Sequence, residues 1–229
     1  MPRALSQPPT DTGLRAQQKA QRLDRILAAA EKLIDRHGES VVTAEAIAEE
    51  AGVSTPTVYN LAGTREELLT ALMVRAMDRF RTDVEALETG TPLERGAQAV
   101  RICAGLFTAR PRLYRDIILR LGGAAGVAAP YPDATPDTVQ INLMQEAARD
   151  GMLVRGTSPL VLGRQIFMSF VGAMAMWAGG RINDDAFLAQ ALHGYFAATA
   201  ACAIEPHRSR LEKLMRREAR WLAQAIDPA

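Results

Sequence analysis

Apolar residues recur every three or four positions along most of this chain, a spacing that is typical of amphipathic helices. No stretch keeps the strict alternation of a half-buried β-strand. The expected fold class is therefore all-α. Helices are predicted over about residues 17–37, 43–50, 54–60, 64–87, 91–109, 110–121, 138–150, 159–180, 184–204 and 207–226.

Local signals mark several of the predicted helix ends. Gly38 supplies a left-handed stop after the first helix. Thr43 and Ser54 are expected to cap the two short helices, because their hydroxyls accept hydrogen bonds from first-turn N–H groups. Thr64 followed by Glu67 has the spacing of a capping box.

Two stretches lack helical periodicity. Residues 1–16 hold prolines and scattered polar groups, and we expect a flexible arm there. Residues 122–137 are rich in proline, glycine and alanine, and we expect a loop. The chain then divides into this arm, a small helical domain over 17–63 and a larger helical domain over 64–229.

Residues 44–63 have the pattern of a helix-turn-helix. Ala48 is small where the two helices would cross, Gly52 allows a tight turn, and Val58 is one of the apolar residues that would face a shared core. The second short helix would then be a recognition helix whose hydroxyl and amide groups meet phosphates and base edges. The other interpretation is that the two helices pack for stability alone.

The net charge of the first 70 residues is negative, which is not what DNA binding leads us to expect. Eight basic residues stand against ten acidic ones, a net charge of −2, whereas a DNA-binding domain is expected to present a basic face. The basic residues gather between Arg15 and Arg25 and at Arg65, while acidic residues lie on the first short helix. We therefore expect modest non-specific affinity and a salt dependence set by few phosphate contacts.

The predicted helices over 159–180 and 184–204 are candidates for a subunit interface. The segment from Ile166 to Trp177 is apolar nearly all round, so it must be covered on more than one side. Small residues such as Gly172 and Ala198 would permit close approach of a second subunit. Burial wholly within one subunit is the alternative.

The larger domain also offers residues for a ligand cavity. Apolar candidates for its walls are Ile102, Leu106, Phe107, Tyr114, Ile118, Met144, Phe167, Met168 and Val171. Polar groups that could orient a ligand are Arg101, Asn142, Gln145 and Gln165. For each of them a place in the ordinary core is the alternative.

Composition narrows the function classes. Among 229 residues, 27 are Lys or Arg and 26 are Asp or Glu, so the net charge of +1 gives no sign of general polyanion binding. The two cysteines fit a reducing compartment, and the longest apolar run is shorter than the roughly 20 residues that span a bilayer, so we expect a cytoplasmic protein without a membrane span. Three scattered histidines and the lack of paired metal ligands argue against an enzyme, a metal site or a cofactor.

The first 70 or so residues resemble the tetracycline-repressor (TetR) family of regulators. The resemblance is carried by His37-Gly38, by the run from Thr43 through Ile47-Ala48, Ala51-Gly52-Val53-Ser54 and Thr57-Val58-Tyr59, and by Thr64-Arg65-Glu66-Glu67-Leu68-Leu69. It implies a homodimer of all-α subunits, each with an N-terminal DNA-binding domain and a C-terminal domain that dimerises and holds a small-molecule inducer. Leu61 and Ala62 depart from the aromatic residues that the family commonly has there, while Arg65 keeps a positive charge for a phosphate.

The expected function is that of a regulator, a repressor, which binds a palindromic double-stranded DNA operator and is released by a small, largely apolar effector. The expected DNA-binding residues are Thr43, Ser54, Thr55, Thr57, Tyr59, Asn60 and Arg65. The alternative is a helical dimer of the same type that acts mainly as a ligand-binding or protein-interaction module with weak DNA recognition.

Overall fold

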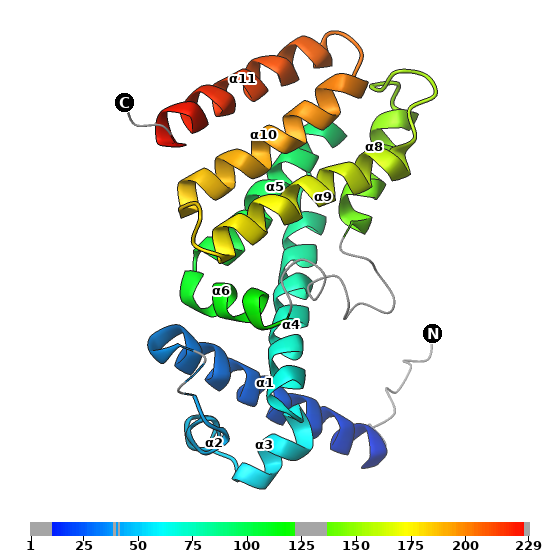
Figure 1. Ribbon diagram of the computed structural model, residues 1–229. Coiled ribbons are helices and arrows are strands. Elements are labelled where there is room, and N and C mark those ends of the chain that lie inside the picture. The colour runs from blue at the N-terminus through cyan, green and yellow to red at the C-terminus, as the bar shows by residue number, and fades with distance from the viewer. Residues whose placement is uncertain (1–10, 39, 41, 122–136, 227–229) are drawn as a thin grey trace, which may run out of the picture. The chain divides into compact units, whose positions relative to one another are not determined.

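The computed structural model describes residues 11–38, 40, 42–121 and 137–226. Within these ranges the regular elements are α-helices, and one isolated β-bridge pairs Leu153 with Ala203. The expected all-α fold class is therefore confirmed (Figure 1). The helices are α1 (Asp11–His37), α2 (Ala44–Ala51), α3 (Thr55–Ala62), α4 (Arg65–Glu85), α5 (Pro92–Thr108), α6 (Pro111–Arg120), α8 (Thr138–Arg149), α9 (Pro159–Ala178), α10 (Asp184–Cys202) and α11 (His207–Ile226).

Helix boundaries differ most from the sequence predictions at the start of the chain. Helix α1 begins at Asp11 rather than near residue 17, because the residues from Leu14 to Ala20 are mostly good helix formers even without a buried face. Residues 11–16 of the expected arm are thus helical, and residues 1–10 lie outside the described ranges. The expected loop over 122–137 also lies outside them, except for Asp137.

The chain forms two compact units, one up to Leu72 and one from Met73 onward. Helix α4 begins in the first unit, and its residues from Met73 belong to the second. In the first unit α1 packs against both α2 and α3. Its core includes Ile26, Ile34, Ile47, Ala48, Val58 and Ala62.

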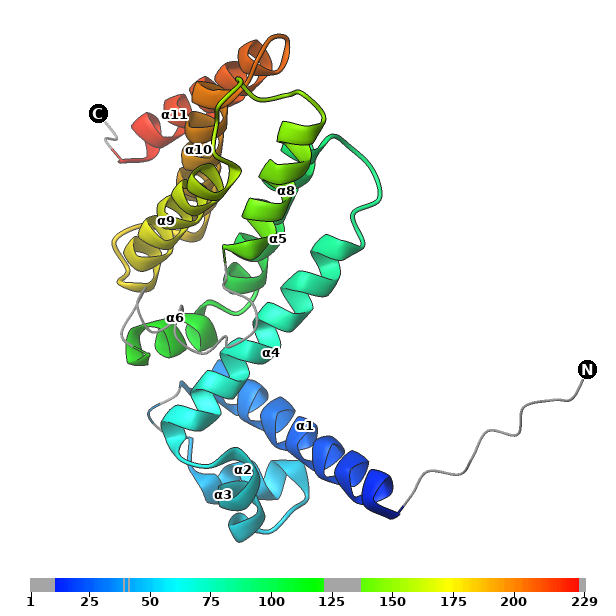
Figure 2. The same ribbon diagram turned by 90° about the vertical axis from the view of Figure 1, so that its right-hand side faces the viewer.

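The second unit is built around α10, which packs against α5, α9 and α11. Helix α8 packs against α5 and α9, and both views show α9 and α10 side by side (Figures 1 and 2). Aromatic rings fill the centre: Trp177 stacks on Phe187 with ring centroids 5.2 Å apart, and Phe107 stacks on Trp177 at 6.4 Å. Such ring pairs add to the free energy gained by burial.

An ion pair links the middle of α6 to the end of α9 and the start of α10. Arg115 donates to Asp184 Oδ1 at 3.1 Å, and its guanidinium lies 4.8 Å from the ring centroid of Trp177. The indole N–H of Trp177 donates to the same carboxylate oxygen at 2.6 Å. The buried indole is therefore hydrogen-bonded, as the large majority of buried polar groups are.

Close packing of α8 on α9 depends on Gly163. A Cβ at this position would lie 2.7 Å from backbone atoms of Ile141, which cannot rotate away as a side chain could. On the exposed side of α5, by contrast, a Cβ at Gly105 would meet nothing within 4 Å. The two glycines thus provide a matched test of the packing.

Gly163→Ala is expected to lower the free energy of unfolding by about 1–3 kcal/mol, because the added methyl forces α8 and α9 apart. Gly105→Ala is expected to leave stability equal or slightly higher, since alanine is the better helix former. Urea unfolding followed by circular dichroism measures both. Equal stability of the two variants would show that the α8–α9 contact is not as tight as described.

Candidate functional site

The turn between α2 and α3 is set by Gly52. Thr43 caps α2 by accepting a hydrogen bond from the Ala46 N–H at 3.2 Å, as its sequence position predicted. Gly52 has φ +64°, and its N–H donates to Glu49 O while the Val53 N–H donates to Ala48 O. These two hydrogen bonds form a Schellman motif, which favours glycine because other residues are strained at positive φ.

A second positive-φ glycine and a capping box separate α3 from α4. Gly63 has φ +71°, and a Cβ there would overlap the carboxylate of Glu67. The Thr64 N–H donates to Glu67 Oε2 at 2.6 Å, and the Glu67 N–H donates to Thr64 Oγ1 at 3.2 Å, so the predicted capping box is present. The hydrogen bond from the Thr64 backbone holds the pKa of Glu67 below its usual value.

Helix α3 buries one face and exposes the opposite one. Val58 and Ala62 are buried, whereas Pro56, Tyr59 and Asn60 are exposed, Tyr59 to 58%. Pro56 and Asn60 are four residues apart and therefore share a side of the helix. Within the described residues neither Tyr59 nor Asn60 makes a side-chain hydrogen bond, so both groups can meet an external partner.

The hydroxyl residues of the predicted site lie nearer the edge of this face. Thr55 and Thr57 are half-buried, and the Thr57 hydroxyl lies 2.8 Å from that of Ser54, with which it hydrogen-bonds. Ser54 occupies the N-cap position of α3, but its side chain makes no cap hydrogen bond, which corrects the expected capping role. The reason is that this hydroxyl is engaged with Thr57 instead.

The remaining predicted DNA contacts stand at helix starts. Thr43 precedes α2 and Arg65 begins α4, and both are exposed. Leu61 is half-buried, so this departure from the family pattern lies beside the core rather than on the outward face. Pro56 was not predicted as part of this face. Its spacing of four from Asn60 was the available signal, because residues four apart lie on the same side of a helix.

An ion pair offsets part of the acidic charge in this unit. Lys32 on α1 pairs with Glu50 on α2, and the hydrogen bond from Lys32 is the main reason that the pKa of Glu50 is lowered. Farther along α1, Arg15, Lys19, Arg22 and Arg25 are exposed. The exposed basic side chains of this unit therefore gather mainly on α1.

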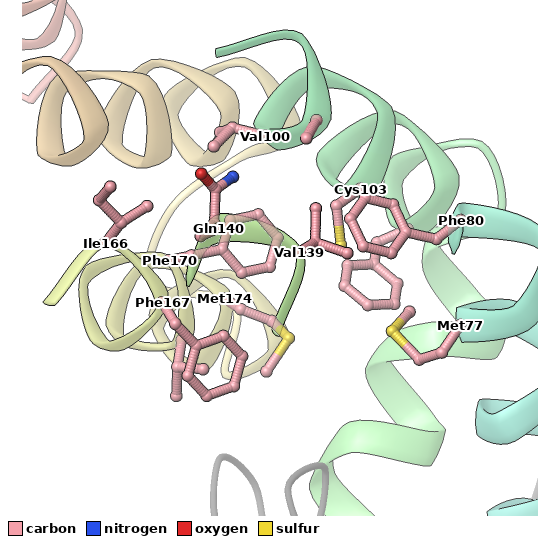
Figure 3. A pocket seen from close by; sticks show the side chains of 13 residues that line it. Met77, Phe80, Val100, Cys103, Val139, Gln140, Ile166, Phe167, Phe170 and Met174 are labelled. Carbon is pink, nitrogen blue, oxygen red and sulfur yellow. The ribbon is translucent and has the colours of Figure 1, made fainter. Parts of the chain in front are cut away.

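The second unit contains a nearly apolar cavity between four helices, with a free volume of about 50 Å³. Helix α4 contributes Met77 and Phe80 on one side, and α9 contributes Phe167 across from them (Figure 3). The described residues that line it are Met77, Phe80, Ala99, Val100, Cys103, Phe107, Val139, Gln140, Ile166, Phe167, Phe170, Val171 and Met174.

Three of the nine apolar residues predicted for a ligand site line this cavity: Phe107, Phe167 and Val171. The others lie elsewhere: Tyr114, Ile118 and Met144 are buried, Ile102 and Leu106 are half-buried, and Met168 is 62% exposed. None of the predicted polar groups, Arg101, Asn142, Gln145 and Gln165, belongs to the lining.

Gln140 and Cys103 are the lining residues with polar or ionisable side-chain groups. Gln140 is 7% exposed; its Nε2 donates to Gly96 O at 3.2 Å, and its Oε1 has no hydrogen-bond donor. A buried acceptor left unpaired costs about 1–3 kcal/mol. Burial raises the pKa of the Cys103 thiol to about 12, so it is a neutral, unreactive group at neutral pH.

Helix α9 exposes a mainly apolar face, on which Gln165 is the polar residue among the described positions 161, 165, 168, 172 and 176. Val161, Met168, Gly172 and Met176 lie on one side of it and are exposed, Val161 to 64%. In the part of the chain that is described, α9 is the helix with the length and composition of a membrane span, a test that core helices of soluble proteins also pass. No group of three or more metal-ligating side chains is found in these same ranges.

Comparisons with known proteins agree with this organisation. The family described as "Bacterial regulatory proteins, tetR family" matches residues 26–72, which contain α2, α3 and the start of α4. A comparison with curated proteins finds no significant match.

Solved structures share the fold over most of the chain. RolR in complex with resorcinol is 19% identical, covers 89% of this chain and 97% of its own, and has a TM-score of 0.65. SmeT, the repressor of the Stenotrophomonas maltophilia efflux pump SmeDEF, is 20% identical over 80% of this chain and 91% of its own, with a TM-score of 0.62. A tetR-family regulator from Mesorhizobium loti is 17% identical over 82% and 99%, with a TM-score of 0.61. The helix-turn-helix segment thus matches the model of the tetR family of bacterial regulatory proteins, and the chain shares its all-helical fold with these solved structures.

Proposed function

We propose that this regulator is a repressor that binds a palindromic operator as a homodimer and leaves it when a small, largely apolar effector binds. The observation that carries the proposal is the pairing, in one chain, of an outward-facing α3 with an apolar cavity in a separate unit. The fold supports a ligand-responsive regulator. The operator, the dimer and the release step are the parts that we propose.

DNA contact is assigned to the exposed face of α3 and to the helix starts beside it. A recognition helix inserts its outward side chains into the major groove, and the amide of Asn60 can hydrogen-bond a base edge there. Arg65 at the start of α4 would contact a phosphate, which positions the subunit without reading sequence. Thr43, Ser54, Thr55, Thr57 and Tyr59 complete the proposed contact set.

Dimerisation is assigned to α9 and α10. The exposed apolar face of α9 would be covered by the same face of a second copy, since a two-fold interface brings each patch onto itself. This cover accounts for the membrane-like composition of α9 without a membrane. A soluble, cytoplasmic dimer follows from the proposal.

Helix α4 is the proposed link between effector and DNA. It supplies Met77 and Phe80 to the cavity, and its first residue is Arg65. A ligand that displaces Met77 or Phe80 therefore acts on the helix that carries a proposed phosphate contact. Operators with two half-sites require a fixed spacing of the recognition helices, so a small displacement is enough to lower affinity.

A coupling experiment tests the release step. A labelled operator fragment, taken from the DNA upstream of the chain's own gene, is titrated with the protein in the presence of small neutral ring compounds. Resorcinol, which is bound in the RolR structure, is the first probe. A coupling of about 1–3 kcal/mol would lower operator affinity roughly 5- to 150-fold.

Linkage provides the decisive control. Operator DNA must weaken binding of the same compound by the same factor, which calorimetry measures with operator and with unrelated DNA of equal length. Equal affinities in both cases would mean that the cavity is not the switch. Ligand binding without any specific DNA binding would favour the ligand-binding module considered as the alternative.

A further inference from the structure

The unpaired oxygen of Gln140 is the unexplained feature of the cavity. Gln140 lies in the first turn of α8, is 7% exposed, and is part of an otherwise apolar lining. Its Oε1 is buried and accepts no hydrogen bond from any residue that the structure describes. In Figure 3 the amide oxygen is turned toward the side of Ile166, and the labelled side chains around it carry no strong donor.

The orientation of this amide is fixed by its other half. Nε2 donates to the backbone oxygen of Gly96 on α5, and rotating the amide would set its oxygen against that carbonyl, with two acceptors facing one another. The nitrogen therefore stays with α5, and the oxygen stays available. Folding alone does not need this acceptor, because a leucine of similar size would fill the space without an unpaired polar atom.

We infer that the cavity takes a neutral ring compound with one hydroxyl or N–H donor, and that this donor binds Gln140 Oε1. The inference rests on the proposed function, since it defines the chemistry of the effector. Four phenylalanine rings in the lining suit a flat ring: Phe80, Phe107, Phe167 and Phe170. Among the described residues no charged side chain lines the cavity, so an ionised ligand would lose its hydration there without compensation.

The cavity has to widen to admit such a ring. Its free volume is about 50 Å³, whereas a cavity that binds benzene measures about 150 Å³. Met77 and Met174 are unbranched and flexible, so they can change conformation at low cost. The same widening gives the ligand access to Oε1, which is enclosed in the ligand-free chain.

Four probes of similar size separate the contributions: phenol donates a hydrogen bond, anisole only accepts one, toluene does neither, and benzoate is charged. Calorimetry with the full-length protein and no DNA is expected to show phenol binding about 10- to 100-fold more tightly than anisole or toluene, and no binding of benzoate. This comparison needs no variant. Anisole binding as tightly as phenol, benzoate binding more tightly, or no binding of phenol would each overturn the inference.

The variant Gln140→Leu assigns the preference to one atom. It is expected to bind phenol and toluene about equally, with a thermal midpoint at or above that of the wild type. Gln145→Leu, on the exposed side of the same helix, is the matched control and should keep the preference for phenol. A Gln140→Leu protein that still prefers phenol would contradict the inference.

These measurements are independent of operator binding because no DNA is present. A chain that prefers phenol but binds no operator would refute the proposed function and leave this inference standing. A chain that binds operator and shows none of these preferences would overturn this inference and leave operator binding standing.

Discussion

Replacing Gly172 with glutamate is expected to convert the protein into a folded monomer that has lost its affinity for the operator. Gly172 is exposed on the apolar face of α9, and a Cβ there meets nothing within 4 Å, so the subunit itself accommodates the change. In a two-fold interface the charge enters twice near the axis, where it is desolvated and repelled by its copy. Loss of the second half-site contact should lower operator affinity by about 10²–10⁴-fold.

Gly105→Glu is the matched control for this variant. Gly105 is also an exposed helical glycine with no atom within 4 Å of a Cβ, but it lies on α5, which is not one of the proposed interface helices. Light scattering gives the mass and circular dichroism gives the helix content. A Gly172→Glu protein that stays dimeric, or a monomer with full operator affinity, would contradict the assignment of α9.

Changes on α3 and at the start of α4 should separate base reading from backbone contact. Asn60→Ala is expected to cost about 1–3 kcal/mol per half-site and to change which operator bases matter. Arg65→Ala should weaken specific and non-specific binding alike and lower the salt dependence by about one phosphate contact per subunit. Titrations of the operator and of unrelated DNA at several salt concentrations measure these effects.

Two exposed residues of the second unit serve as controls. Asn142→Ala and Arg181→Ala remove the same side-chain types from positions outside the proposed contact set, and both should leave DNA binding unchanged. Operator affinity that is unaffected by both Asn60→Ala and Arg65→Ala would refute the assigned DNA contacts.

Local sequence signals were sufficient for the helix-turn-helix. The capping by Thr43, the turn at Gly52 and the Thr64–Glu67 box each depend on residues within a few positions of one another, and the structure contains all three. The capping role of Ser54 was wrong, because the choice between a backbone partner and the nearby Thr57 hydroxyl depends on side-chain rotation. The start of α1 was missed because the residues before 17 have no buried face to produce a periodic pattern.

The cavity was harder to predict, because its walls come from four helices that are distant in sequence. Apolar periodicity marks Tyr114, Ile118 and Phe107 as buried residues, but it does not tell which of them border free volume. Gln145 on the same helix was predicted to orient a ligand, whereas no pattern in the sequence pointed to Gln140. Its burial follows from how α8 packs on α5 and α9, which a single sequence does not contain.

The central claim is that this chain reads a two-fold operator, and a footprint of the purified protein on the DNA upstream of its own gene tests it most directly. The account predicts protection of two symmetric half-sites whose centres lie about one helical turn, or a multiple of it, apart. The protection should disappear with Gly172→Glu and persist with Gly105→Glu. Absence of any protected site, or protection that Gly172→Glu leaves unchanged, would contradict the account.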